Sequence, residues 1–153
     1  AAGAGAEGGH GDGEGLRVVH VVPDTDAYRA LAAGVGGEDH VLEIGSCLGQ
    51  CTAILHATAA SVVGFDVSQA YLASCRSRLP GIRFEFLDIF EEADRLRAMP
   101  EAAACTVAFV DIGGDRRLRQ VLDAVGAVRA CLPRLRRAVV KSEELHGAML
   151  GWG

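Results

Sequence analysis

The sequence predicts an α/β fold, in which an open, doubly wound and mostly parallel sheet carries helices on both faces. Two patterns indicate this fold. First, short apolar segments alternate with segments whose apolar residues recur at helical spacing. Second, the short segments are hydrophobic almost throughout, as strands covered on both faces must be. Ligands bind such sheets at the carboxyl ends of the strands, so functional residues are expected there.

The first elements predicted are a strand and a helix. Residues 17–22 are rich in Val and predict a strand that ends at Pro23. The acidic residues in 24–26 then indicate the start of a helix, because negative side chains are favourable in a first helical turn. Apolar residues at helical spacing continue this helix as far as the Gly36-Gly37 pair.

Strands and helices alternate along the rest of the chain. Strands are predicted at residues 41–44, 61–65, 82–87, 106–110 and 138–140. Helices are predicted at residues 51–58, 69–79, 91–99 and 118–132, with Ser68 as the N-cap of the second. Three of these strands end on an acidic residue, namely Asp66, Asp88 and Asp111. Together with a Gly-rich turn after residues 41–44, these acids are expected along one rim of the sheet.

Composition separates the first fifteen residues from the rest of the chain. Residues 1–15 hold seven of the 20 Gly and no apolar side chain larger than Ala, so we expect a disordered Gly/Ala-rich tail. Residues 16–153 suffice for one domain of ordinary size and are too few for two. The chain does not begin with an initiator Met, which is expected of a processed form or of a fragment.

Charge and cysteine content exclude several classes of protein. The net charge of -5 does not indicate a dedicated nucleic-acid binder. The five cysteines are odd in number and include no C-x-x-C pair, so we expect thiols in a reducing compartment, most of them buried, and no metal. No segment is long and apolar enough to span a membrane, and no secretory signal is visible. We therefore expect an intracellular protein, either cytoplasmic or organellar.

The Gly-rich turn spans residues 45–49. Gly45 and Gly49 allow a sharp bend and the close approach of a ligand, and the following helix offers free N–H groups to an anion. A simple strand-to-helix turn is the alternative. Cys47 and Gln50 stand where the dinucleotide pattern G-x-G-x-x-G has glycines, and no Lys is available for a P-loop. NAD and ATP are therefore poor candidates for this turn.

Two strand-end carboxylates suit a nucleoside. Asp66 can accept hydrogen bonds from both hydroxyls of a ribose, and Asp88 can accept one from an exocyclic amine such as that of adenine. In each case the alternative is a carboxylate that only caps a helix or faces solvent.

The pattern of Glu43, Gly45 and Gly49, with Asp66 after the following strand, resembles that of class I S-adenosylmethionine-dependent methyltransferases, which have a Rossmann-like fold. The resemblance covers about residues 24–145. It implies a methyltransferase with S-adenosyl-L-methionine as cofactor. The residues implied for cofactor binding are Glu43, Gly45, Ser46, Cys47, Gly49, Asp66, Val67, Asp88, Ile89 and Asp111.

The same resemblance implies a role for each part of the motif. Glu43 would lie near the methionine amine, and residues 45–49 would wrap the amino-acid moiety. Asp66 would hold the ribose hydroxyls. Asp88 would meet the adenine amine, with Ile89 packed on the ring.

Asp111 and Lys141 are the residues implied for catalysis. They resemble two members of the Lys-Asp-Lys-Glu set of RNA ribose 2′-O-methyltransferases, with Arg29 in place of the first Lys. A solvated strand-end charge is the alternative for Lys141. Metal-dependent catechol-type methyltransferases use an Asp-Asn pair, and this chain has no Asn.

The expected partner is an unidentified methyl acceptor, either a small molecule or RNA. A non-catalytic cofactor-binding or interaction domain is the alternative to an enzyme.

The second half of the chain is locally basic. Helical spacing predicts that Arg116 and Arg119 lie on the solvated side of a helix, and a phosphate-contacting surface for RNA is the alternative.

The superfamily resemblance also bears on the end of the chain. Sheets of this kind usually have two more strands after the fifth, and residues 142–153 are too few for them. We therefore expect C-terminal strands to be missing, either because the chain is a fragment or because it is a shortened member in which the sheet edge beside residues 139–141 is open. A narrower similarity, carried by residues 41–49, 110–116 and 139–145, is to poorly characterised plant and algal methyltransferase-like proteins.

Overall fold

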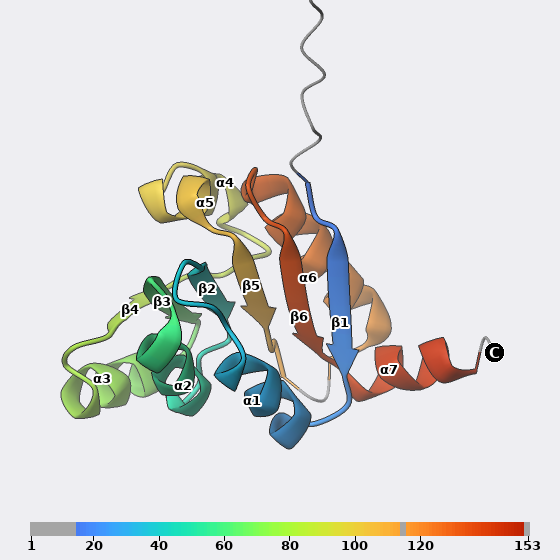
Figure 1. Ribbon diagram of the computed structural model, residues 1–153, viewed down its shortest axis with the longest axis horizontal. Helices are drawn as coiled ribbons and strands as arrows, with labels where there is room; N and C mark the ends of the chain where they lie inside the picture. Colours follow the sequence, from blue (N-terminus) through green and yellow to red (C-terminus); the bar gives the residue numbers. More distant parts are fainter. Residues whose placement is uncertain (1–14, 114–115, 152–153) are drawn as a thin grey trace, which may run out of the picture.

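The computed structural model describes residues 15–113 and 116–151 and confirms the predicted α/β class. Its six strands form one parallel sheet in the order β1-β6-β5-β2-β3-β4 (Figure 1). The strands are β1 (Val18–Val22), β2 (His40–Ile44), β3 (Ser61–Asp66), β4 (Arg83–Phe86), β5 (Val107–Val110) and β6 (Arg137–Lys141). The helices are α1 (Thr25–Ala33), α2 (Gln50–Thr58), α3 (Gln69–Arg78), α4 (Ala93–Arg97), α5 (Pro100–Ala104), α6 (Leu118–Cys131) and α7 (Glu143–Leu150). The tail predicted at residues 1–15 lies outside the described residues except for its last position.

Helices cover both faces of the sheet, which explains why the central strands are apolar on both sides. On one face, Tyr28 of α1 and Leu55 of α2 pack against strand residues such as Phe109. On the other face, α4, α5 and α6 pack through residues that include Leu96 and Val121. Figure 1 shows α1 and α6 on opposite sides of the sheet. The core is therefore two apolar layers with the sheet between them.

Short local signals set most of the element boundaries. The side chain of Asp24 accepts a hydrogen bond from the Ala27 amide, and Ser68 caps α3 in the same way, as predicted. The short helix predicted at residues 91–99 is confirmed as α4, which covers Ala93–Arg97, and a break separates it from α5, which was not predicted. Pro100 explains the break, since a residue before Pro avoids helical dihedrals and Met99 is extended.

The first strand closes the edge that was expected to be open. β1 pairs in parallel with β6, from Val18 opposite Arg137 to Val22 opposite Lys141. The prediction of an open edge beside residues 139–141 was therefore wrong. The β-branched residues of β1 were visible in the sequence, but which strand they pair with depends on contacts far along the chain.

The segment after β6 forms a helix. α7 begins after Ser142, whose side chain accepts a hydrogen bond from the Leu145 amide, and it contacts β1 and α6. None of the helices in residues 15–113 and 116–151 has the length and apolar content needed to cross a membrane.

Candidate functional site

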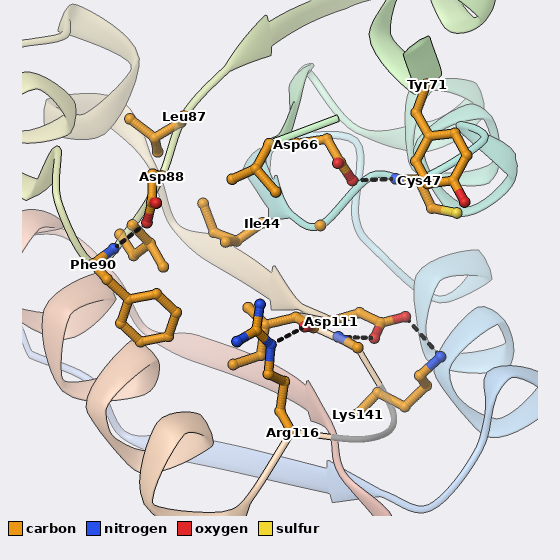
Figure 2. Close-up of a pocket in the computed structure, with 15 residues that line it drawn as sticks. Ile44, Cys47, Asp66, Tyr71, Leu87, Asp88, Phe90, Asp111, Arg116 and Lys141 are labelled. Carbon is orange, nitrogen blue, oxygen red and sulfur yellow. Dashed lines mark hydrogen bonds and ion pairs between the residues drawn. The ribbon is translucent and has the colours of Figure 1, made fainter. Parts of the chain in front are cut away.

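A cavity of about 390 Å³ opens at the carboxyl ends of the strands (Figure 2). It lies where the strand order reverses: from β2 the chain moves outward to β3 and β4, then returns to β5 on the other side of β2. The helices that follow β2 and β5, α2 and α6, pack on opposite faces of the sheet, and ligands bind at such a place in open α/β sheets. The lining residues are Ile44, Gly45, Cys47, Asp66, Val67, Tyr71, Leu87, Asp88, Ile89, Phe90, Asp111, Ile112, Gly113, Arg116 and Lys141.

Gly45 begins the turn that leads from β2 into the cavity. Its φ is +90°, and its amide and that of Ser46 both donate to the Phe65 carbonyl at 2.8 Å. A Cβ atom at Gly45 would lie 1.7 Å from the carbonyl oxygen of Asp111. Glycine is therefore required because the backbone after β5 passes directly over the turn, in addition to any demand a ligand makes.

Two further residues of the turn have a left-handed backbone, Cys47 and Gly49. Cys47 has φ +50°, is exposed, and donates its amide to Oδ2 of Asp66 at 2.8 Å. Gly49, at φ +78°, caps α2, and a Cβ there would lie 2.9 Å from Leu79 and 3.0 Å from Phe84. The expectation that most of the cysteines are buried thiols is confirmed, since the other four are buried.

Asp66 ends β3 and faces the cavity. Its Oδ1 accepts the Ser68 amide and its Oδ2 accepts the Cys47 amide, both at 2.8 Å. Each carboxylate oxygen has a second lone pair for another donor. The two interpretations left open for Asp66 are therefore compatible, since it ties the turn to the start of α3 and also lines the cavity.

Asp88 occupies the corresponding place after β4. Its Oδ1 accepts the Phe90 amide at 2.9 Å, so it too combines a local turn contact with a place in the cavity wall. Leu87 and Ile89 on either side are buried and give an apolar wall. Phe90 and Tyr71 are exposed at the rim, at 42% and 43%.

Asp111 and Lys141 meet at the other side of the cavity. The Nζ of Lys141 lies 2.7 Å from Oδ2 of Asp111 and donates to Oγ1 of Thr25 at 3.2 Å. The two paired side chains are only 20% and 18% exposed. The interpretation of Lys141 as a solvated strand-end charge is therefore wrong. Thr25 reaches this place because β1 pairs with β6 and leads into α1.

Glu43 lies behind the cavity and does not line it. It is 1% exposed and accepts hydrogen bonds from the hydroxyls of Thr52 and Tyr28. Burial raises the pKa of Glu43 to about 7, although the hydrogen bond from Thr52 acts in the opposite direction. Ser46 and Gly49 are also buried and outside the cavity lining.

The sequence missed several lining residues. Tyr71 was visible as part of the α3 stripe, and its place in the first turn after Ser68 is a signal for the rim. Arg116 was expected on the solvated side of a helix, but α6 begins only at Leu118. Its Nε donates to the Ile112 carbonyl at 3.3 Å, and the residue lines the cavity. Arg29 bonds to Gln50 and is not part of the lining.

Comparison with known structures identifies this architecture. No protein-family model matches the sequence, and no curated protein matches it. The structure is similar to a dimethyladenosine transferase from Plasmodium falciparum, with 19% identity over 86% of this chain and 46% of that chain and a TM-score of 0.63. It is also similar to an rRNA methylase from Streptococcus thermophilus, with 20% identity over 82% of this chain and 75% of that chain and a TM-score of 0.53. The chain has the class I methyltransferase fold.

A third similar structure is an S-adenosylmethionine-dependent methyltransferase from Mesorhizobium loti, with 26% identity over 72% of this chain and 47% of that chain and a TM-score of 0.50. The chain spans about half the length of this protein and of the Plasmodium enzyme.

Proposed function

We propose that this chain binds S-adenosylmethionine in the cavity and transfers its methyl group to an acceptor. One observation carries the proposal: Asp66 ends β3 beside the Gly-rich turn and lines the cavity, with both of its carboxylate oxygens fixed by backbone amides. A carboxylate held in this way suits a pair of ribose hydroxyls. The fold of the chain, shared with methyltransferases, supports the same proposal.

The residues around the cavity fit the other parts of this cofactor. Asp88 is available to an exocyclic amine, and the apolar side chains of Leu87 and Ile89 suit the faces of an aromatic ring. Gly45 and Cys47 line the side that would take the amino-acid moiety. We assign Glu43 a supporting role, in which it holds Thr52 of α2 and Tyr28 of α1 behind the turn.

When bound, this cofactor supplies a methyl group on a positively charged sulfur. The chain then has to orient a lone pair of the acceptor and exclude water from the reacting atoms. Asp111 can accept a hydrogen bond from the acceptor, and Lys141 and Thr25 fix the direction of its carboxylate. A base is required only where the acceptor must lose a proton.

RNA ribose is a second candidate for the acceptor. The 2.7 Å contact between Lys141 and Asp111 supports it, because the resemblance to RNA ribose 2′-O-methyltransferases rests on these two residues. One of the similar structures is that of an rRNA methylase. The narrower similarity to plant and algal methyltransferase-like proteins and an intracellular place remain predictions, and so does a non-catalytic role.

Calorimetry with S-adenosylmethionine tests cofactor binding. We expect Asp66→Ala to weaken binding at least about tenfold, because two hydrogen bonds to a charged group are worth more than about 1.4 kcal/mol. Asp123→Ala, which removes an exposed charge from α6, is the matched control and should bind as the wild type does. Equal affinities of the wild type and Asp66→Ala would contradict the assignment.

Transfer of tritiated methyl groups to fractionated RNA, protein and small-molecule pools tests catalysis and acceptor class together. Label in the RNA pool that resists alkali at the modified linkage would indicate ribose methylation. Cofactor binding without transfer to any pool would favour the non-catalytic alternative.

A further inference from the structure

Two side chains of α3 hold consecutive carbonyl groups of the Gly-rich turn. The thiol of Cys75 donates to the Cys47 carbonyl with a sulfur–oxygen distance of 3.2 Å. Nη2 of Arg78 donates to the Leu48 carbonyl at 2.7 Å. Cys75 and Arg78 are three residues apart, so they lie on the same side of α3. The turn therefore has a second set of contacts besides those that tie it to β3.

The same side of α3 forms the surface on which the turn lies. A Cβ atom at Gly49 would lie 2.9 Å from Leu79, 3.0 Å from Phe84 and 3.1 Å from the sulfur of Cys75. These neighbours belong to a small apolar cluster of α3 and β4 in which Cys75 and Phe84 are buried. The turn is consequently held from below by packing and at its carbonyls by hydrogen bonds.

The conformation of Cys47 explains why such contacts matter. A left-handed φ is unfavourable for a residue with a side chain, so Cys47 needs support from its surroundings to keep φ +50°. Its two flanking peptide groups are both fixed: the amide by Asp66 and the carbonyl by Cys75. Holding both peptides fixes φ and ψ of Cys47 together.

We propose that Cys75 and Arg78 are positioning residues for cofactor binding, which hold the turn so that the Cys47 amide stays on Asp66. The link to the cofactor rests on the proposed function, whereas the link between α3 and the turn rests on the contacts described above. Burial raises the pKa of the Cys75 thiol, which keeps it protonated and able to donate. Neither residue lines the cavity, so both act through Cys47 and Asp66.

Arg76 provides a matched control on the same helix. Its Nε and Nη2 donate to the Phe84 carbonyl of β4 at 3.1 and 2.8 Å, so it makes the same kind of bond to a different segment. Arg76→Gln and Arg78→Gln each remove one guanidinium that binds a backbone carbonyl. Only Arg78→Gln removes a contact with the turn.

Amide hydrogen exchange of the cofactor-free protein is the first measurement. We expect Arg78→Gln and Cys75→Ala to raise the exchange rate of the Cys47 amide at least about fivefold, and Arg78→Lys, which keeps a donor, to raise it less. Arg76→Gln should leave this amide within about twofold of the wild type. Equal exchange in Arg78→Gln and Arg76→Gln would overturn the positioning role, whether or not the cofactor binds.

Calorimetry with S-adenosylmethionine is the second measurement. We expect Arg78→Gln and Cys75→Ala to weaken binding about five- to tenfold, with Arg76→Gln within twofold of the wild type. Faster exchange with unchanged affinity would overturn the link between the turn and the cofactor. A wild type that fails to bind would refute the proposed function, and exchange would still decide whether α3 holds the turn.

Discussion

The two sides of the cavity hold their carboxylates differently. On the β3–β4 side, the contacts of Asp66 and Asp88 within the described residues are with backbone amides. On the β5–β6 side, Asp111 is paired with the ammonium of Lys141 at 2.7 Å. The first side therefore keeps net negative charge and free lone pairs, whereas on the second side Lys141 balances the charge of Asp111 and fixes the direction of its carboxylate. This difference is what a site needs to bind hydroxyls and amines at one end and to orient an acceptor at the other.

Gly45 joins the two sides, and replacing it should have the largest effect. In Gly45→Ala, the new methyl group would lie 1.7 Å from the Asp111 carbonyl oxygen at a φ of +90°. β2 and β5 would have to separate where both sides of the cavity begin. We expect the free energy of unfolding to fall by more than about 4 kcal/mol, measured by urea denaturation.

Gly81→Ala is the control for this experiment. A Cβ at Gly81 meets nothing within 4 Å, so we expect a change within about 0.5 kcal/mol. Similar losses in the two variants would mean that Gly45 is not a special junction.

Glu43 lies below this junction, and its charge should make stability depend on pH. Its pKa is raised by burial from 4.5 to about 7, so the folded state binds more protons than the unfolded state between these values. The stability contributed by the protonated carboxyl is thus full below pH 4.5 and is lost as pH rises to about 7. A difference of about 2.5 pKa units corresponds to about 3 kcal/mol.

Glu43→Gln isolates this effect, because the amide stays neutral. We expect the unfolding free energy of the wild type, relative to this variant, to fall by about 3 kcal/mol between pH 4.5 and 7 and to level off above that range. Urea denaturation at several pH values measures it. Parallel pH profiles for the two proteins would refute a raised pKa.

The sequence predicted best those site residues whose place depends only on where a strand ends. Asp66, Asp88 and Asp111 all line the cavity, because strand ends are visible as apolar segments and parallel strands place their ends on one rim. Glu43 is also an acidic residue near the end of a strand, but it lies behind the cavity, since Tyr28 and Thr52 from two helices cover it. That arrangement depends on helix packing, which periodicity does not specify.

Fold prediction had the same limit. The starts of α1 and α3 were predicted because Asp24 and Ser68 act on residues three positions away. The place of β1 was not, because its partner β6 is more than a hundred residues away in the chain. Thr25 was missed for this reason, since only that pairing brings it to Lys141.

Lys141→Met is expected to leave the carboxylate on the second side without an ammonium partner, as on the first side. Its effect on stability should be smaller than those of the changes at Gly45 and Glu43. It leaves Asp111 without its ammonium partner while keeping most of the side-chain volume. The pair is partly exposed, so solvent offsets part of the loss, and we expect the free energy of unfolding to fall by about 1–2 kcal/mol. Urea denaturation at low and high salt measures the fall and its screening.

A double-mutant cycle with Asp111→Asn separates the pair from its surroundings. If the ion pair sets the difference between the two sides, Asp111→Asn should recover part of the loss in Lys141→Met, with a coupling of about 1 kcal/mol that decreases in salt. Thr25→Val removes the other acceptor of Lys141 without changing charge, so its effect should be smaller and insensitive to salt. A coupling near zero, with Thr25→Val as costly as Lys141→Met, would mean that hydrogen bonding to α1 holds Lys141 and that the ion pair does not distinguish Asp111 from Asp66.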